Sequence, residues 1–272
     1  MQSIRIVTLN LWNGQRGVER RMEVLVPQIL SLQPHVVTLQ EVLEKPGPGG
    51  IMQGHIIAEA LRGDYRFGVV DAHSPGGPIG NAIVSRLPIT NELHLQLPGP
   101  PGDLRGAIRC DVTTPAGRIA IVTTHLSWEL DKPQVREDQV LVLEEFARQN
   151  PGPIPTVMTG DFNCTPDALV HQFLTGRASL RGKGTYWRDA FARRHPHSDG
   201  FTWSARNPYV ARSVERNRRV DYVFVGSMKD EGPGSIMHAR VVLDLPGADE
   251  VYPSDHFGIF MEMALGPVAD GV

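Results

Sequence analysis

The stretch Thr159-Gly160-Asp161-Phe162-Asn163 lies where a short apolar run ends and a turn-forming run begins. We therefore expect a buried strand that delivers polar residues onto a turn. In extended chain Asp161 and Asn163 project from the same face, so both side chains should reach one object. Gly160 would let the backbone come close to whatever binds there, and Phe162 would turn back into the core. For this stretch alone, an Asx-type turn without a site is the alternative.

The composition is that of an ordered globular protein. Of the 272 residues, 41% are hydrophobic and 21% are charged, which is ample material for a core. The formal net charge of −3 gives no support for nucleic-acid binding through bulk positive charge. A local basic patch stays open, so nucleic acid is not excluded as a partner.

The cysteine count and the hydrophobic runs indicate a cellular compartment. Cys110 and Cys164 are the two cysteines, which gives no disulfide framework. The first residues have the pattern of a strand and lack the apolar stretch of a signal peptide. No run approaches the ~18 apolar residues of a membrane span. We therefore expect a cytoplasmic protein without a transmembrane segment.

Strand-like runs outnumber helical ones along the chain. Many strands with few helices between them predict two packed sheets with helices outside, not a single doubly wound parallel sheet. Helical spacing or capping signals predict helices over 18–32, 56–62, 134–149 and 166–173. The predicted strands are 4–10, 36–42, 67–70, 81–86, 106–113, 118–124, the run ending at Met158, 220–225, 240–243 and 257–263.

Polar or charged residues end six of these strands. Strands packed side by side put their ends along one rim, so these residues can meet although they are far apart in sequence. Four carboxylates in one place would repel by several kcal/mol, so the cluster implies a bound cation or a raised pKa. Oxygen ligands favour Mg²⁺ or Mn²⁺, and no histidine or cysteine has zinc spacing. The alternative is a scatter of turn and surface groups. The strand ends are Asn10, Glu41, His125, Asp161 with Asn163, Asp221, and Asp255 with His256.

The order and the residues of these motifs resemble the signature set of the endonuclease/exonuclease/phosphatase family. That family includes pancreatic-type deoxyribonucleases, abasic-site endonucleases, inositol polyphosphate 5-phosphatases and neutral sphingomyelinases. The resemblance implies a single domain over residues 1–272 with an α/β fold, a four-layered α/β sandwich of two packed mixed β-sheets flanked by helices. The motifs are Leu9-Asn10, Leu39-Gln40-Glu41, Thr124-His125-Leu126, Gly160-Asp161-Phe162-Asn163, Val220-Asp221-Tyr222 and Ser254-Asp255-His256.

The same resemblance implies roles for the site residues. Glu41 is similar to the main metal-binding carboxylate, assisted by Asn10 and Asp255, for Mg²⁺ or Mn²⁺. The catalytic residues it implies are Asp161 and Asn163, which position the attacking water and the phosphate, His256 as base or phosphate contact, Asp221 as its orienting partner, and His125 near the leaving group.

Substrate contacts are expected from Arg105, Asn163 and Trp128. Arg105 is similar in place to a phosphate-contacting arginine, with a surface arginine as the alternative. The segment 201–219 is rich in aromatic residues and arginine and leads into the strand with Asp221. We expect this segment, with Trp128, to set selectivity, and a solvated loop over a satellite core is the alternative.

Two departures from the family pattern stand out. Pancreatic deoxyribonucleases carry Tyr-x-Glu before the strand that here begins at Asn81, and the Glu pairs with a histidine. This chain has Pro78-Ile79-Gly80-Asn81 instead, so His125 lacks that partner. The Gly-Asn form is more similar to the sphingomyelinase-type and many bacterial members. His35 stands where Pro-Asp is common, which we attribute to local turn chemistry.

The expected activity is that of a metal-dependent phosphodiesterase. In-line attack on a phosphodiester needs an activated water, a stabilised leaving oxygen, and donors around the phosphoryl oxygens. A phosphomonoesterase of the sugar- or inositol-phosphate type and a nuclease are alternatives, since the core residues do not distinguish them. A catalytically inactive binding scaffold is a third hypothesis, which the full set of chemical residues disfavours.

Overall fold

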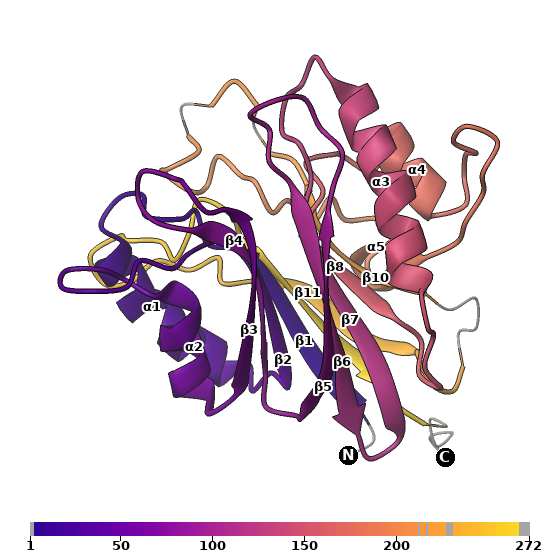
Figure 1. The fold of residues 1–272 in the computed structure, drawn as a ribbon, viewed down its shortest axis with the longest axis horizontal. Coiled ribbons are helices and arrows are strands. Elements are labelled where there is room, and N and C mark those ends of the chain that lie inside the picture. The colour runs from indigo at the N-terminus through magenta and orange to yellow at the C-terminus, as the bar shows by residue number, and fades with distance from the viewer. Residues whose placement is uncertain (1–2, 212, 216, 227–230, 267–272) are drawn as a thin grey trace.

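Two six-stranded mixed sheets pack face to face, with helices over their outer faces (Figure 1). The computed structural model describes residues 3–211, 213–215, 217–226 and 231–266. The predicted four-layered sandwich is confirmed. Within the described ranges, no helix is both long and apolar enough to cross a bilayer.

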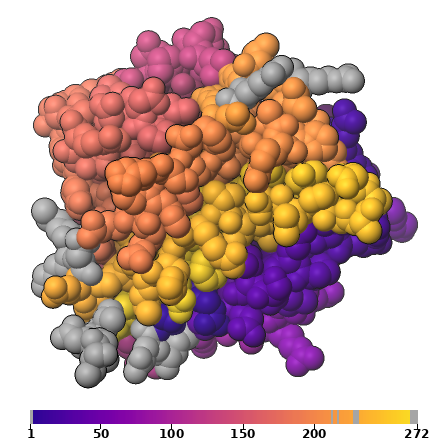
Figure 2. Space-filling view, turned by 180° about the vertical axis from the view of Figure 1, so that it is seen from behind, coloured from indigo at the N-terminus to yellow at the C-terminus, as the bar shows by residue number. Residues whose placement is uncertain are grey.

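The first sheet combines both ends of the chain. Its strand order is β11-β12-β1-β2-β4-β3. β1 and β2 pair in parallel, and the other neighbouring strands in this order pair antiparallel. Figure 2 shows the C-terminal segment in yellow beside the N-terminal segments in indigo. The strands are β1 (Ser3–Asn10), β2 (Val36–Leu43), β3 (Asp64–Asp71), β4 (Ile79–Ser85), β11 (Ile236–Val242) and β12 (Gly258–Ala264).

The second sheet has the order β5-β6-β7-β8-β10-β9. β7 and β8 pair in parallel, whereas β10 runs antiparallel to β8. As a result, β7 and β8 end at the edge where β10 begins. The strands are β5 (Ile89–Gln96), β6 (Gly106–Thr114), β7 (Gly117–His125), β8 (Val157–Asp161), β9 (Arg188–Asp189) and β10 (Asp221–Val225).

Three apolar layers hold the sandwich together. One lies between the sheets and is built from alternate residues such as Ile4, Ile108 and Val223. The other two lie under the helices, because each sheet also buries its outer face. α1 (Val18–Ser31) and α2 (Gln53–Leu61) cover the first sheet, α3 (Pro133–Arg148) and α4 (Leu169–Leu174) cover the second, and α5 (Ala190–Arg194) packs against β10 and β11.

A layer of polar side chains replaces the apolar core near one edge. Thr159 Oγ1 donates to Thr38 Oγ1 at 2.8 Å, and Gln40 Nε2 donates to Thr123 Oγ1 at 2.8 Å and to Thr8 Oγ1 at 3.1 Å. The Thr159–Thr38 and Gln40–Thr123 bonds join the two sheets within one to three residues of the strand-end polar groups. They therefore fix how those groups face one another.

Some element predictions were wrong. β5, β9 and α5 were not predicted; β5 is a largely exposed edge strand, so its sequence lacks clean alternation. α4 begins at Leu169, because Pro166 and Asp167 form a turn before it. α2 begins three residues earlier than predicted, at Gln53, where Glu44 Oε1 accepts the Gly54 N–H at 2.8 Å and so caps the first turn.

Candidate active site

The predicted site residues gather at one edge of the sandwich, around a cavity of about 740 Å³. β1, β7 and β8 end at this edge, and β10 begins there. Asn10 and Asp221 lie just beneath the cavity wall, each hydrogen-bonded to a residue that lines it. The predicted residues that line the cavity are Glu41, Arg105, His125, Trp128, Asp161, Asn163, Asp255 and His256.

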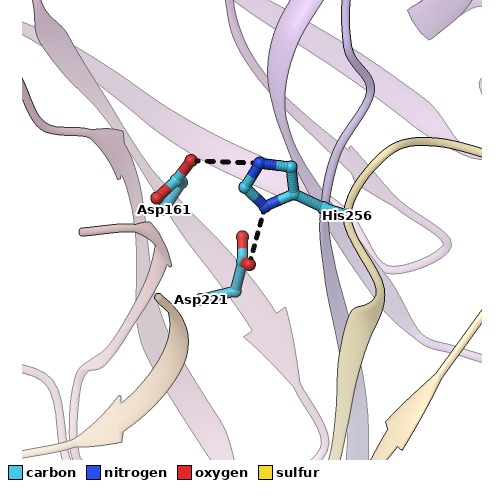
Figure 3. A group of neighbouring side chains, drawn as sticks. All are labelled: Asp161, Asp221 and His256. Carbon is cyan, nitrogen blue, oxygen red and sulfur yellow. Dashed lines mark hydrogen bonds and ion pairs between the residues drawn. The ribbon is translucent and has the colours of Figure 1, made fainter. Parts of the chain in front are cut away.

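His256 lies between two buried carboxylates (Figure 3). Its Nδ1 is 2.9 Å from Asp221 Oδ2, and its Nε2 is 3.8 Å from Asp161 Oδ2. Burial alone would lower the pKa of His256, but Asp221 and Asp161 outweigh burial and raise the pKa well above its usual value. The arrangement therefore favours a protonated imidazole that faces the cavity through Nε2.

The pKa of His125 shifts in the opposite direction, although Asp161 Oδ2 lies 3.4 Å from its Nε2. Asn163 Nδ2 lies 3.0 Å from His125 Nε2, and Glu41 Oε1 lies 3.9 Å from its Nδ1. Burial, with the nearby positive charges of Arg105 and His256, lowers the pKa of His125 well below its usual value. A neutral His125 can accept the Asn163 amide proton at Nε2, so the two histidines differ in charge.

Glu41, Asn10 and Asp255 lie together on the first-sheet side of the cavity. Asn10 Nδ2 is 3.3 Å from Glu41 Oε1 and 3.1 Å from Asp161 Oδ2, and Asn13 Nδ2 donates to Glu41 Oε2 at 2.8 Å. Glu41 has a φ of 49° at an irregularity in the β2–β4 pairing. Burial, and then the charge of Glu41, raise the pKa of Asp255 to about 6.

The cavity has an excess of negative charge that fits a hard cation. Burial first and Asp221 second raise the pKa of Asp161 to about 7. Asp221 Oδ1 is buried and has no hydrogen-bond partner among the described residues. Ligand atoms of Asp161, Asp221 and His256 lie within 4.8 Å of one another. Oxygen-rich sites of this kind suit Mg²⁺ or Mn²⁺.

The geometry of the Asp161–Asn163 stretch differs from the prediction. β8 ends at Asp161, and Asn163 has a left-handed φ of 47°, so the two residues do not share a face of an extended strand. The Asn163 N–H donates to Asp161 Oδ1 at 2.9 Å, which is the Asx-type turn. That turn directs the Asn163 amide toward the cavity. Gly160 permits close approach of β7, because a Cβ there would lie 2.0 Å from Thr124 O.

Asp255 and His256 both line the cavity although they are adjacent. Ser254 produces the necessary bend: its Oγ accepts the His256 N–H at 3.2 Å. The same hydroxyl donates to Asn10 O at 2.6 Å. One side chain therefore joins the loop before β12 to the end of β1.

Arg105 and Trp128 line the cavity on the second-sheet side. Arg105 Nε donates to Asp103 Oδ1 at 2.7 Å, which orients the guanidinium. Trp128 is 63% exposed. Its loop is held from below by α3, where Gln139 Oε1 accepts the Ser127 N–H at 2.9 Å.

The predicted selectivity segment reaches the cavity only in part. Trp203, Glu215 and Arg218 line the cavity. Arg206 pairs with Asp244 and Arg219 pairs with Asp189, so these two arginines do not support the prediction. Arg212 and Arg216 lie outside the described residues.

A sequence profile described as "Endonuclease/Exonuclease/phosphatase family" matches residues 7–256 of the chain. The chain belongs to this family. The match includes every predicted site residue, from Asn10 to His256. The family fold is that of phosphoesterases and nucleases. In this chain, that fold brings together acidic and histidine side chains that could bind a metal.

Other family proteins share the fold at low sequence identity. TDP2 of D. rerio, in a structure complexed with a single strand DNA product, superposes with a TM-score of 0.77 and 19% identity, over 96% of this chain and 98% of that chain. The human nocturnin catalytic domain, in a structure with a bound sulfate anion, has a TM-score of 0.71 and 21% identity, over 97% and 93% of the two chains.

Two curated relatives extend the comparison. The uncharacterized protein YbhP of Escherichia coli K12 is 26% identical over 176 residues, which is 59% of this chain and 67% of that protein. Drosophila melanogaster nocturnin is 24% identical over 92% of this chain, and the match spans 42% of nocturnin's own length.

The family motifs did not identify Arg21, which organises the site from beneath. Arg21 is fully buried in α1, and its guanidinium donates to Leu11 O at 2.7 Å and Asn13 O at 2.7 Å. It also donates to Pro253 O at 3.1 Å. One side chain therefore holds the loop after β1 against the loop before β12. The sequence signal that could have identified Arg21 is its position on the apolar face of the helix that follows Asn10, because a buried arginine needs hydrogen-bond acceptors nearby.

Proposed function

We propose that the protein is a divalent-metal-dependent phosphodiesterase that hydrolyses its substrate by in-line attack of water. The observation that carries this proposal is the excess of buried carboxylates around His256 in a cavity of about 740 Å³. Such a site attracts a cation, and its size suits a phosphate that bears two substituents. Membership of a family of phosphoesterases supports the same reaction class.

The proposed metal ligands are Glu41 and Asp255, assisted by Asn10. Asp161, Asp221 and His256 form an alternative ligand group by proximity. However, the two carboxylates favour a protonated His256, and a proton would have to leave before either ring nitrogen could bind a metal. A cation bound between Asp255 and Glu41 would lower the raised pKa of Asp255, because it would offset the repulsion between the two carboxylates. Bound there, Mg²⁺ or Mn²⁺ would neutralise charge on the phosphoryl oxygens.

The chain's own residues take the remaining roles in this proposal. Asp161 accepts a hydrogen bond from the attacking water and directs it at phosphorus, and Asn163 donates its amide to the phosphate. Protonated His256 donates from Nε2 to a phosphoryl oxygen, with Asp221 fixing the ring through Nδ1. His125 lies near the leaving group beside Asn163.

Arg105 and Trp128 complete the proposed substrate contacts. The Arg105 guanidinium, oriented by Asp103, offers bidentate contact to a phosphate oxygen pair. The exposed indole of Trp128 offers an apolar face to the group beyond the scissile ester. A phosphomonoesterase of the sugar- or inositol-phosphate type is the alternative, and the comparison of a diester with a monoester below decides between them. The DNA complex belongs to TDP2, and for this chain nucleic acid stays one substrate among several.

The test compares bis(p-nitrophenyl) phosphate with p-nitrophenyl phosphate in Mg²⁺, in Mn²⁺ and in chelator. We expect the diester to be turned over faster, and only with metal. Glu41→Gln keeps the size but removes the charge, so activity should fall by a factor on the order of 10² or more with folding intact. Glu59→Gln, an exposed glutamate on α2, is the matched control. Full activity of Glu41→Gln in chelator would contradict the metal assignment.

A further inference from the structure

The segment Thr202–Trp203 lies between the two parts of the chain that carry Asp221 and His256. On one side, Trp203 exchanges backbone hydrogen bonds with Arg218, at 2.9 and 2.7 Å. On the other side, Trp203 forms a β-bridge with His256, and Thr202 O accepts the Phe257 N–H at 2.7 Å. This short segment therefore acts as a third strand between the approach to β10 and the approach to β12.

Thr202 fixes the backbone of Asp221. Its Oγ1 accepts the N–H of Val220 at 3.1 Å and the N–H of Asp221 at 3.2 Å. Thr202 is fully buried, so these bonds are shielded from water. The partner of His256 is thus held by the residue next to Trp203.

The Trp203 ring contacts the imidazole of His256 directly. The ring centroids are 4.8 Å apart, and the planes meet at 66°. At its other end, Trp203 Nε1 donates to Glu215 O at 2.8 Å, so the indole is anchored. The interactions of His256 with Asp221 and Asp161 run through its two nitrogens, and the ring keeps rotational freedom about its Cα–Cβ and Cβ–Cγ bonds. An anchored indole against the ring removes this freedom.

We propose that Trp203 is a positioning residue that holds the His256 imidazole in the orientation needed to meet the phosphate. The inference rests on the proposed function, because it assigns a role within that reaction. It goes beyond the family motifs, which contain His256 and Asp221 but not Trp203. A misplacement of about 1 Å at a reacting group can cost on the order of 10²-fold in rate.

The test measures kcat and KM for bis(p-nitrophenyl) phosphate with Mn²⁺. Trp203→Leu should lower kcat by about ten- to a hundredfold with KM changed less than about threefold. Trp203→Phe keeps a ring against His256 and should restore kcat to within about fivefold of the wild type. Trp203→Met, which fills much of the volume without a ring, replaces Trp203→Leu if that variant fails to fold.

A double-mutant cycle separates positioning from a general structural role. In a His256→Ala background, Trp203→Leu should lower kcat by less than about twofold further, because the group it positions is gone. Tyr186→Leu is the matched control: this aromatic ring is 41% exposed and lies outside the active-site cavity, so neither kcat nor KM should change. Equal losses from Trp203→Leu in both backgrounds would overturn the proposal, as would a rise in KM alone. Absence of wild-type turnover would instead contradict the proposed function.

Discussion

Two buried histidine–carboxylate clusters lie next to each other at β10, since Asp221 belongs to that strand and the His171 ring contacts Tyr222, and they differ in electrostatics. In the active site, His256 bonds Asp221 and faces Asp161. In the second cluster, His171 Nε2 lies 2.9 Å from Asp189 Oδ2, beside a separate cavity of about 590 Å³. Both histidines are buried and both bond a buried carboxylate, so residue type and burial do not distinguish them.

The two clusters differ in whether a positive side chain balances the negative charge of each buried carboxylate. Burial would raise the pKa of Asp189, but His171 and Arg219 outweigh it and lower the pKa below its usual value. Arg219 Nη1 lies 2.5 Å from Asp189 Oδ2, so the second cluster holds its own cation. In the active site, the pKa of Asp161 is raised to about 7. Uncompensated negative charge, not a His–Asp pair, therefore marks the site that can take a metal and a phosphate.

The largest expected effect is the loss of rate on breaking the active-site pair. If Asp221 holds His256 protonated and oriented, Asp221→Asn should lower kcat by a factor on the order of 10² or more. Adding His256→Ala to Asp221→Asn should change kcat little further, because the two residues act as one unit. Steady-state kinetics on the diester measure both effects. Independent, multiplicative losses would show that the pair does not work as a unit.

Breaking the second cluster should have the opposite signature. Asp189→Asn leaves the buried guanidinium of Arg219 without its counter-charge, which should lower the free energy of unfolding by about 3 kcal/mol. The kcat of the folded protein should stay within about threefold of the wild type, because Asp189 lies outside the active-site cavity. Urea unfolding and diester kinetics on the same sample give the two numbers. A loss of kcat without a loss of stability would make the second cluster part of the reaction.

Sequence patterns predicted the rim of polar strand ends because each strand end can be recognised from the residues next to it in the sequence. Asn10, His125 and Asp161 each end an apolar run, and runs of that kind form adjacent strands. The many predicted strands with few helices between them indicated two packed sheets with helices outside, and the family resemblance implied the four-layered sandwich. The assigned catalytic and metal-binding roles stay predictions that kinetics must test.

Features that depend on distant contacts could not be predicted. Arg21 contacts Pro253 across 232 positions, and Gln40 reaches Thr123 across 83. The sequence could not show whether the chain bends at Asn163 or stays extended, because both conformations place polar residues after a strand. Likewise, the second cluster becomes distinguishable from the active site only when Arg219 is seen beside Asp189.

A third histidine, His35, extends the comparison to a ring that bonds no carboxylate among the residues that the structure describes. His35 Nδ1 accepts the Arg5 N–H at 2.9 Å, and burial first, then the charges of Arg5 and Arg86, lower the pKa of His35 to about 4. A lowered pKa means that the unfolded chain binds a proton more readily than the folded one. The stability that neutral His35 contributes is therefore present above about pH 6.5 and is lost as pH falls toward 4.

The expected effect is small because the His35 ring is only half-buried and partly screened by water. The wild type should lose about 1 kcal/mol more unfolding free energy between pH 7 and pH 4.5 than His35→Asn, whose amide can accept the same N–H without titrating. Urea unfolding of both proteins at the two pH values, in chelator, gives the difference and cancels the titration of the active-site carboxylates. Equal losses in the two proteins would mean that His35 does not titrate in this range. A smaller loss in the wild type would mean that the folded protein binds the His35 proton more tightly than the unfolded chain. That result would contradict the lowered pKa, because the ring nitrogen accepts a backbone N–H and faces two arginines.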